Sequence, residues 1–377
     1  MSKGYLTTHV LDTFNGSPGS GINGCLYKLE DQNNKYYQYA VKKEISLGEK
    51  GNTAPQKYPP HIDLHPLINQ YRNCTFFDVN NNKEDGWYEF IKSKVGKQKK
   101  GLTLGSGAGR HELNLSAIKV VEEWTSIDLV ENPLDESSKA ETNTFLTGDL
   151  NFMELPYEEF DLVYCRGILH HIVNLENLVS QIYKSLKPNG YLIVYEYVGV
   201  EKWQWSRRHL RLLKKEAKAI LQEKGHKLSF RSKTIGQMNN RPLESIRSSE
   251  IPSIINNYFE PLFEVIWNKI LYSFTNSRVK QNANEDPNYI NEIISFAISL
   301  EKKYKDDNSL QPTELIGVYN KKSTVKLKNV VPWTDREIRY RLGSHKLNYL
   351  LTKIRYKINS NFIRIERFIL ESLNSFQ

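Results

Sequence analysis

The stretch Gly101–Glu112, GLTLGSGAGRHE, joins a short apolar run to glycines at alternate positions and then to a helix-compatible segment. The apolar run predicts a β-strand that ends in a tight turn, and the residues after the turn predict a helix. Gly105, Gly107 and Gly109 permit positive φ angles and let a ligand approach the backbone closely. Because free N–H groups at a helix start favour anions, this turn is predicted to hold a carboxylate or a phosphate.

Two acidic residues follow at the ends of the next two segments. The apolar run 120–129 places Asp128 about 20 residues after the turn, where nucleotide-binding α/β folds hold the ribose hydroxyls of their ligand. Asp149 stands in TGDLN, residues 147–151, at the end of the following segment. Both acids are therefore predicted to lie near the glycine turn, at the carboxyl edge of a parallel sheet.

Further patterns complete an ordered set of motifs. FDLVYC (160–165) has the pattern of a buried strand, RGILHH (166–171) follows it, and LKPNG (186–190) leads into the apolar run 191–197. Together with the glycine turn and the two acids, this order resembles the class I S-adenosylmethionine-dependent methyltransferases. The resemblance covers roughly residues 60–322. It implies an α/β fold, a Rossmann-like seven-stranded methyltransferase sheet with helices on both faces.

A narrower resemblance rests on EYVG (196–199) and the QW that follows at 204–205. These motifs are similar to a bacterial subfamily whose fifth strand ends in EYVG and continues into a QW segment. That subfamily carries serine or threonine where most relatives have an acid in the first motif, and a glutamate soon after the glycines. Thr103 and Glu112 match these positions. Members often stand near, or are joined to, enzymes that build glycans or natural products.

The resemblance implies S-adenosylmethionine as the cofactor. The glycine turn would leave room for the methionine end of the cofactor. Asp128 would bind the ribose hydroxyls, and Asp149 with the Leu150 backbone would bind the adenine. With Thr103 in place of the usual acid, either Glu112 or a water molecule would support the ammonium group. The predicted cofactor-binding residues are Gly105, Ser106, Gly107, Gly109, Glu112, Asp128, Leu129, Asp149, Leu150 and Arg166.

Methyl transfer is an in-line displacement, for which a protein supplies alignment and, where the acceptor needs one, a base. His171 is the first candidate for a base, because it follows the fourth strand at the carboxyl edge of the sheet. His170 and Glu196 are further catalytic candidates, with Tyr197 as an orienting group. No metal site is expected, since the three cysteines lack ligand spacing.

The motifs predict an S-adenosylmethionine-dependent methyltransferase that most readily acts on a hydroxyl of a small molecule or glycan. Methylation of a peptide or protein stays open, as does a non-catalytic binding or scaffold role for the same fold. CRGI (165–168) differs from the Asn/Asp-Pro-Pro-aromatic loop of amino-group DNA methyltransferases. The glycines lack the Lys-Ser/Thr of a phosphate-binding loop, which argues against a P-loop NTPase.

Residues 1–58 are predicted to form a small β element, from short alternating runs and a Gly/Ser/Pro turn. Their opening, THVLDT (8–13), resembles the first half of the transthyretin-like 5-hydroxyisourate hydrolases. His9 matches the catalytic histidine of that family, whereas Asn52 stands where the family has its catalytic arginine. The resemblance therefore implies a β appendage without hydrolase activity.

The methyltransferase domain is assigned to residues 59–322, with 201–245 as an insertion on the acceptor side, and 323–377 to a basic amphipathic helical tail. Residues 321–377 hold 13 Lys/Arg and 4 Asp/Glu, which accounts for the whole net charge of +9. The tail is predicted to dock on the enzyme body or a second copy, or to contact an anionic membrane surface. Binding of nucleic acid ranks last. With no apolar signal segment, a cytoplasmic protein is expected, peripheral at most at the inner membrane face.

Overall fold

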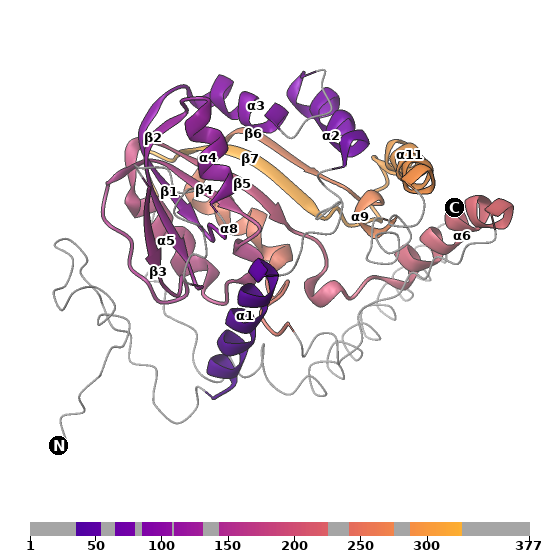
Figure 1. Ribbon diagram of the computed structural model, residues 1–377, viewed down its shortest axis with the longest axis horizontal. Coiled ribbons are helices and arrows are strands. Elements are labelled where there is room, and N and C mark those ends of the chain that lie inside the picture. Colours follow the sequence, from indigo (N-terminus) through magenta and orange to yellow (C-terminus); the bar gives the residue numbers. More distant parts are fainter. Residues whose placement is uncertain are drawn as a thin grey trace, which may run out of the picture.

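The computed structural model describes residues 35–53, 65–79, 85–107, 109–130, 143–224, 241–274 and 287–325 (Figure 1). Its centre is a seven-stranded sheet in the order β3-β2-β1-β4-β5-β7-β6, in which β7 alone runs antiparallel to its neighbours. The strands are β1 Gln98–Leu104, β2 Val121–Asp128, β3 Asn143–Thr147, β4 Phe160–Arg166, β5 Leu186–Tyr197, β6 Phe259–Trp267 and β7 Glu314–Lys321. This topology confirms the predicted Rossmann-like methyltransferase sheet.

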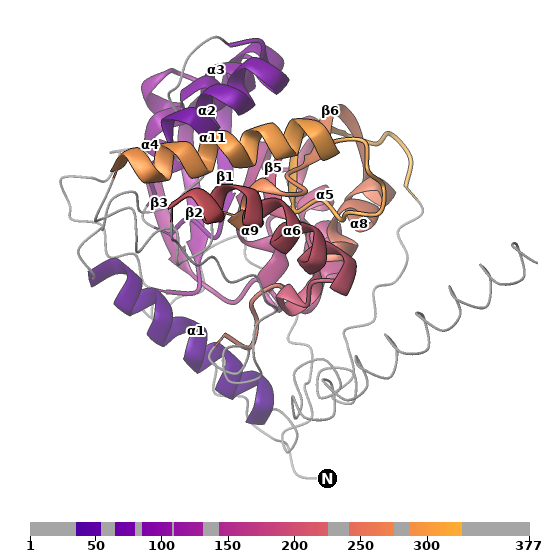
Figure 2. The ribbon, with the colours of Figure 1, turned by 90° about the vertical axis from the view of Figure 1, so that its right-hand side faces the viewer.

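Helices cover both faces of the sheet, because its central strands bury side chains on both sides (Figures 1 and 2). In β4, Leu162 and Tyr164 belong to the core on one face, while Val163 and Cys165 belong to the core on the other. The first face carries α2 Pro66–Arg72, α3 Asp85–Val95, α4 Arg110–Ala117, α6 Arg207–Lys224, α9 Leu271–Phe274 and α11 Pro287–Tyr304. The second carries α5 Leu175–Ser185 and α8 Ile251–Tyr258.

Short helical turns join these elements. They are η2 Asn73–Phe77, η4 Leu169–His171, η5 Glu201–Trp203 and η6 Ser248–Glu250. η4 follows β4 directly, so the two predicted histidines stand at the edge where open α/β sheets form their sites.

A further helix, α1 Lys35–Thr53, lies apart from both layers and crosses the molecule at the carboxyl ends of the parallel strands (Figures 1 and 2). The prediction of a β element over residues 1–58 is wrong for this segment. Tyr37 and Ala40, three positions apart, are buried together with Val173 and Leu243. Burial of this helical stripe against the sheet edge stabilises a helix where local pattern had suggested strands.

Several predicted boundaries fall outside the described residues. Residues 1–34 and 54–58 of the predicted β element are among them, as are 326–377 of the predicted tail. Among the described residues, no helix is both long and apolar enough to cross a membrane.

Candidate active site

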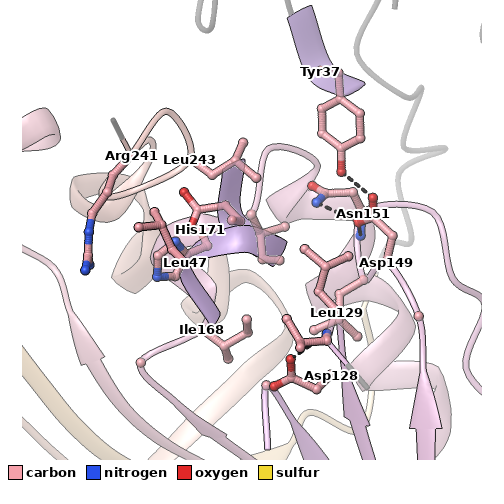
Figure 3. Close-up of a pocket in the computed structure, with 17 residues that line it drawn as sticks. Tyr37, Leu47, Asp128, Leu129, Asp149, Asn151, Ile168, His171, Arg241 and Leu243 are labelled. Atoms are coloured by element: carbon pink, nitrogen blue, oxygen red, sulfur yellow. Dashed lines mark hydrogen bonds between the residues drawn. The ribbon is translucent and has the colours of Figure 1, made fainter. Parts of the chain in front are cut away.

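A cavity of about 320 Å³ opens at the carboxyl edge of the sheet (Figure 3). The predicted residues Gly105, Asp128 and Asp149 line it, and the backbone neighbours Leu129 and Leu150 do so as well. The structure therefore brings the glycine turn and both predicted acids to one cavity, although they are far apart in the chain.

The glycine turn has the backbone that its sequence predicts. Gly105, Gly107 and Gly109 have φ angles of 69°, 51° and 68°, in the left-handed region that side chains disfavour. A Cβ added at Gly105 would lie 2.6 Å from Cγ1 of Ile168, so close packing also requires glycine there. A Cβ at Gly107 would meet no atom within 4 Å, which leaves open space above this part of the turn.

Asp128 ends β2 with its carboxylate turned toward the glycine turn. Its Oδ2 accepts a hydrogen bond of 2.8 Å from the Gly107 N–H, and its Oδ1 accepts one of 3.0 Å from the Val130 N–H. Each carboxylate oxygen can accept a second hydrogen bond. The side chain is thus held in place while it keeps capacity to accept from a ligand.

Asp149 is held from two sides. Its Oδ1 accepts from the backbone and side-chain N–H groups of Asn151, each at 3.0 Å. Its Oδ2 accepts a 2.5 Å hydrogen bond from the hydroxyl of Tyr37 on α1 (Figure 3). This contact fastens α1 to the sheet edge, and a ligand at Asp149 would share or displace the tyrosine hydroxyl.

Behind the glycine turn lie buried polar atoms without a hydrogen-bond partner among the described residues. They include Oγ of Ser106 and Oε2 of Glu112. Oε1 of Glu112 accepts a 2.9 Å hydrogen bond from Ser126, and burial raises the pKa of the Glu112 carboxyl group. Since buried polar groups are normally paired, these atoms suit a polar or charged ligand group at this end of the cavity.

Arg166, predicted to bind the cofactor, is directed elsewhere. Its guanidinium carbon lies 4.6 Å from the ring centroid of Tyr195, whose side chain belongs to the core on the first face of the sheet. Arg166 is not among the residues that line the cavity. A direct cofactor contact is therefore not what this geometry favours.

Two of the predicted catalytic residues form a buried ion pair behind the cavity wall. His170 Nδ1 lies 2.8 Å from Oε2 of Glu196, and His170 Nε2 lies 3.3 Å from Oε1 of Glu244. Burial lowers the pKa of His170, but its bonds to the two carboxylates outweigh burial and raise the pKa to about 10. The other oxygen of Glu196 accepts from the backbone N–H groups of Ile168 and Leu169. Glu196 therefore holds the segment after β4 in shape.

His171 is the predicted catalytic residue that reaches the cavity (Figure 3). Burial, together with the neighbouring positive charge of His170, lowers the pKa of His171 to about 3. The imidazole of His171 is thus neutral near pH 7. Tyr197 lies behind it, with its hydroxyl donating to the Val200 carbonyl at 3.2 Å, and is not a lining residue.

Four lining residues at the His171 end were not found from the sequence. Glu44 and Leu47 come from α1, and Arg241 and Leu243 come from the segment that follows residues 225–240 (Figure 3). Burial raises the pKa of Glu44, and the Oε1 atom of Glu44 has no hydrogen-bond partner among the described residues. The spacing of residues 37, 40, 44 and 47 is that of one helix face and was the available signal. Arg241 and Leu243 belong to residues 201–245, whose position on the acceptor side stays a prediction.

Comparison with known proteins finds similarity in the central part of the chain. Residues 102–194 match the family model described as a methyltransferase domain. Phosphoethanolamine N-methyltransferase of Plasmodium falciparum is 29% identical over 119 residues, which are 30% of this chain and 44% of that protein. The sterol 24-C-methyltransferase ERG6 of Saccharomyces cerevisiae is 44% identical over 61 residues, 16% of this chain and 15% of that protein. The chain thus spans less than half the length of these relatives.

Solved structures with a similar arrangement include the N-methyltransferase NodS of Bradyrhizobium japonicum in complex with S-adenosylhomocysteine. It is 11% identical, with a TM-score of 0.40, over 74% of this chain and 98% of that one. Phosphoethanolamine N-methyltransferase 2 of Haemonchus contortus is 16% identical, with a TM-score of 0.37, over 70% of this chain and 58% of that one. The narrower bacterial subfamily and the transthyretin-like resemblance stay predictions.

Proposed function

We propose that this chain, whose residues 102–194 are a methyltransferase domain, transfers a methyl group from S-adenosylmethionine to a small acceptor. The observation that carries the proposal is the convergence of Gly105, Asp128 and Asp149 on one cavity at the carboxyl edge of the sheet. A glycine turn and two strand-end acids are what a nucleoside with a charged amino-acid tail requires.

The residues present fit this cofactor. The open space above Gly107 and the buried unpaired atoms of Ser106 and Glu112 would receive its amino-acid end. Asp128 would hold the ribose hydroxyls, and Asp149 the adenine. When bound, S-adenosylmethionine supplies a reactive sulfonium methyl group. The protein then has to align the acceptor and to exclude water.

For the acceptor we propose a hydroxyl group on a small molecule or a glycan unit. The cavity of about 320 Å³ is at the lower end for ligand sites and would also receive the cofactor, so the room left at its His171 end favours a small acceptor or one terminal group of a larger one. A peptide acceptor is the alternative, since a single side chain would also enter. The named relatives are N- and C-methyltransferases, so the choice of oxygen rests on the site chemistry alone.

A hydroxyl acceptor must lose its proton as the methyl group is transferred, and the acceptor end offers two bases. The pKa of His171 is lowered to about 3, so its imidazole is a weak base, but its unprotonated ring nitrogen can accept a hydrogen bond. The pKa of Glu44 is raised, which moves this carboxylate toward the range in which a base works best near pH 7. We assign Glu44 as the base and His171 as the group that orients the hydroxyl.

Calorimetry with S-adenosylhomocysteine tests the proposal directly. The wild-type chain is expected to bind it, and failure to bind would remove the enzyme assignment. A screen of phenols, carboxylic acids and glycans for products heavier by one methylene group would then identify the acceptor. Cofactor binding without methylation of any acceptor class, peptides included, would favour the scaffold alternative.

Gly107→Ala is expected to weaken binding of S-adenosylhomocysteine by at least about tenfold, a loss of about 1.4 kcal/mol. The new Cβ meets no protein atom within 4 Å, so it enters space that the proposed cofactor needs. Gly96→Ala is the matched control, because Gly96 has a similar φ of 64° and equally open surroundings after α3. Both variants should lose similar stability, roughly 1–2 kcal/mol. Equal affinity in the two variants would contradict the assignment of the turn.

A further inference from the structure

Two adjacent histidines and a glutamate meet at the acceptor end of the cavity. His170, His171 and Glu244 each place one possible ligand atom within 4.8 Å of the other two. The ring centroids of His170 and His171 are 4.2 Å apart, and His170 Nε2 is 3.3 Å from Oε1 of Glu244. We call these three residues the His–His–Glu cluster.

We propose that the His–His–Glu cluster binds a divalent transition-metal ion of the zinc type. Two imidazole nitrogens and one carboxylate oxygen suit Zn²⁺, Co²⁺, Mn²⁺ or Fe²⁺ and are a poor set for Mg²⁺ or Ca²⁺, which prefer oxygen ligands. His170 and Glu244 are buried and His171 is partly buried, so the donors are fixed by their surroundings. Three protein ligands leave coordination positions for water or substrate.

The surroundings of His170 support this assignment independently. Its second ring nitrogen, Nδ1, lies 2.8 Å from Glu196, which directs Nε2 toward Glu244. Glu196 is itself held by the backbone N–H groups of Ile168 and Leu169, at 2.6 and 2.8 Å. A carboxylate that orients a histidine from behind is the usual support of a metal ligand.

The fixed charges around the cluster also permit a cation. Glu44, Glu196 and Glu244 bring three carboxylates to this region, whereas Arg241 and Lys202 bring two cationic side chains. Burial lowers the pKa of Lys202 to about 8. Arg241 pairs with Oε2 of Glu244 at 3.1 Å and leaves Oε1 facing His170. An ion bound to Nε2 of His170 would displace the proton from that atom, and the three carboxylates would then outnumber the two cationic side chains by one, so a divalent ion would not meet a net positive field.

The cluster also has a use in the proposed reaction, and this part of the inference rests on the proposed function. His171 lines the cavity, so an ion held by it would lie at the acceptor end, and His171 would then orient the hydroxyl through the ion. A hydroxyl bound to the ion would give up its proton more readily, with Glu44 close by to receive it. Metal binding itself requires neither cofactor nor acceptor, and it can be measured alone.

The test is titration of the full, chelator-treated chain with Co²⁺, followed by visible absorption, and with Zn²⁺, followed by calorimetry. One tightly bound ion per chain is expected. His171→Ala and Glu244→Gln should each weaken it by more than Glu196→Gln, for which a loss of about 10–100-fold is expected. Glu176→Gln is the matched control, since Glu176 pairs with Arg247 outside the cluster and should leave the affinity unchanged.

Two results would overturn the proposal. No tight binding to the wild-type chain would mean that His170 bridges Glu196 and Glu244 as a protonated side chain without a metal. Equal affinity in the wild-type chain and both ligand variants would place the ion elsewhere in the chain. Binding of S-adenosylhomocysteine by the same variants shows that they are folded. It also separates a failed metal site from a failed cofactor site.

Discussion

Asp128→Ala is expected to weaken binding of S-adenosylhomocysteine by about 100-fold, because charge-assisted hydrogen bonds contribute roughly 1.5–3 kcal/mol each. Asp128 lines the cavity at the end of β2 and would accept from both ribose hydroxyls. The change also removes the acceptor for the Gly107 N–H, so part of the loss comes from a less ordered turn. Calorimetry on wild-type and variant chains measures the difference.

Asp128→Asn separates the loss of the negative charge from the loss of the acceptor for the Gly107 N–H. Asparagine keeps one acceptor oxygen for a backbone N–H but loses the charge, so an intermediate affinity is expected. Asp161→Asn is the matched control, since Asp161 stands at the amino end of β4, where it pairs with Lys187. An unchanged affinity for Asp128→Ala would remove the ribose site, and with it the proposed placement of the cofactor.

The second large effect is on stability. Glu196→Ala is expected to lower the free energy of unfolding by about 3–5 kcal/mol, the usual loss when one partner of a buried ion pair is removed. Glu196 is 1% exposed and accepts from the backbone N–H groups of Ile168 and Leu169 as well as pairing with His170. Alanine would leave all three donors buried without this partner. Denaturant titration of the variant measures the loss.

Glu196→Gln gives a graded comparison. Glutamine retains an acceptor oxygen for the backbone groups but not the negative charge that faces His170, so a smaller loss is expected. Glu123→Ala, at an exposed position of β2, should change stability by no more than about 0.5 kcal/mol. If Glu196→Ala lost no more than this control, Glu196 would not hold the segment after β4. Its place among the catalytic candidates would then reopen.

Local patterns were sufficient for the sheet and for the cofactor side of the site. Alternating glycines permit the positive φ angles of a tight turn, and Gly105 and Gly107 have them. Asp128 and Asp149 follow successive parallel strands, and strands of that kind end at one edge of a sheet. Neighbouring residues and strand order decide these features, so they can be recognised in the chain before it folds.

The catalytic candidates show where this reasoning stops. His170, His171 and Glu196 all stand at the predicted edge, yet one of them faces the cavity and the other two pair behind it. Arg166 was predicted to contact the cofactor, and its guanidinium lies over the ring of Tyr195 and not among the residues that line the cavity. The side chains of adjacent residues in a short helical turn point in different directions. The sequence alone does not indicate which of these side chains faces the cavity once the chain has packed.

By itself, the sequence determined a Rossmann-like seven-stranded sheet, its glycine turn and the two acids that border the cavity. Only the tertiary structure decided what closes that cavity and what surrounds the acceptor. Tyr37 and Glu44 line the cavity from α1, a helix in a segment that was predicted to be a β element. Glu244 pairs with His170, which lies 74 positions earlier in the chain. The physical reason is that backbone conformation and strand order follow local pattern, whereas charge pairing and burial between distant segments exist only after the chain has folded.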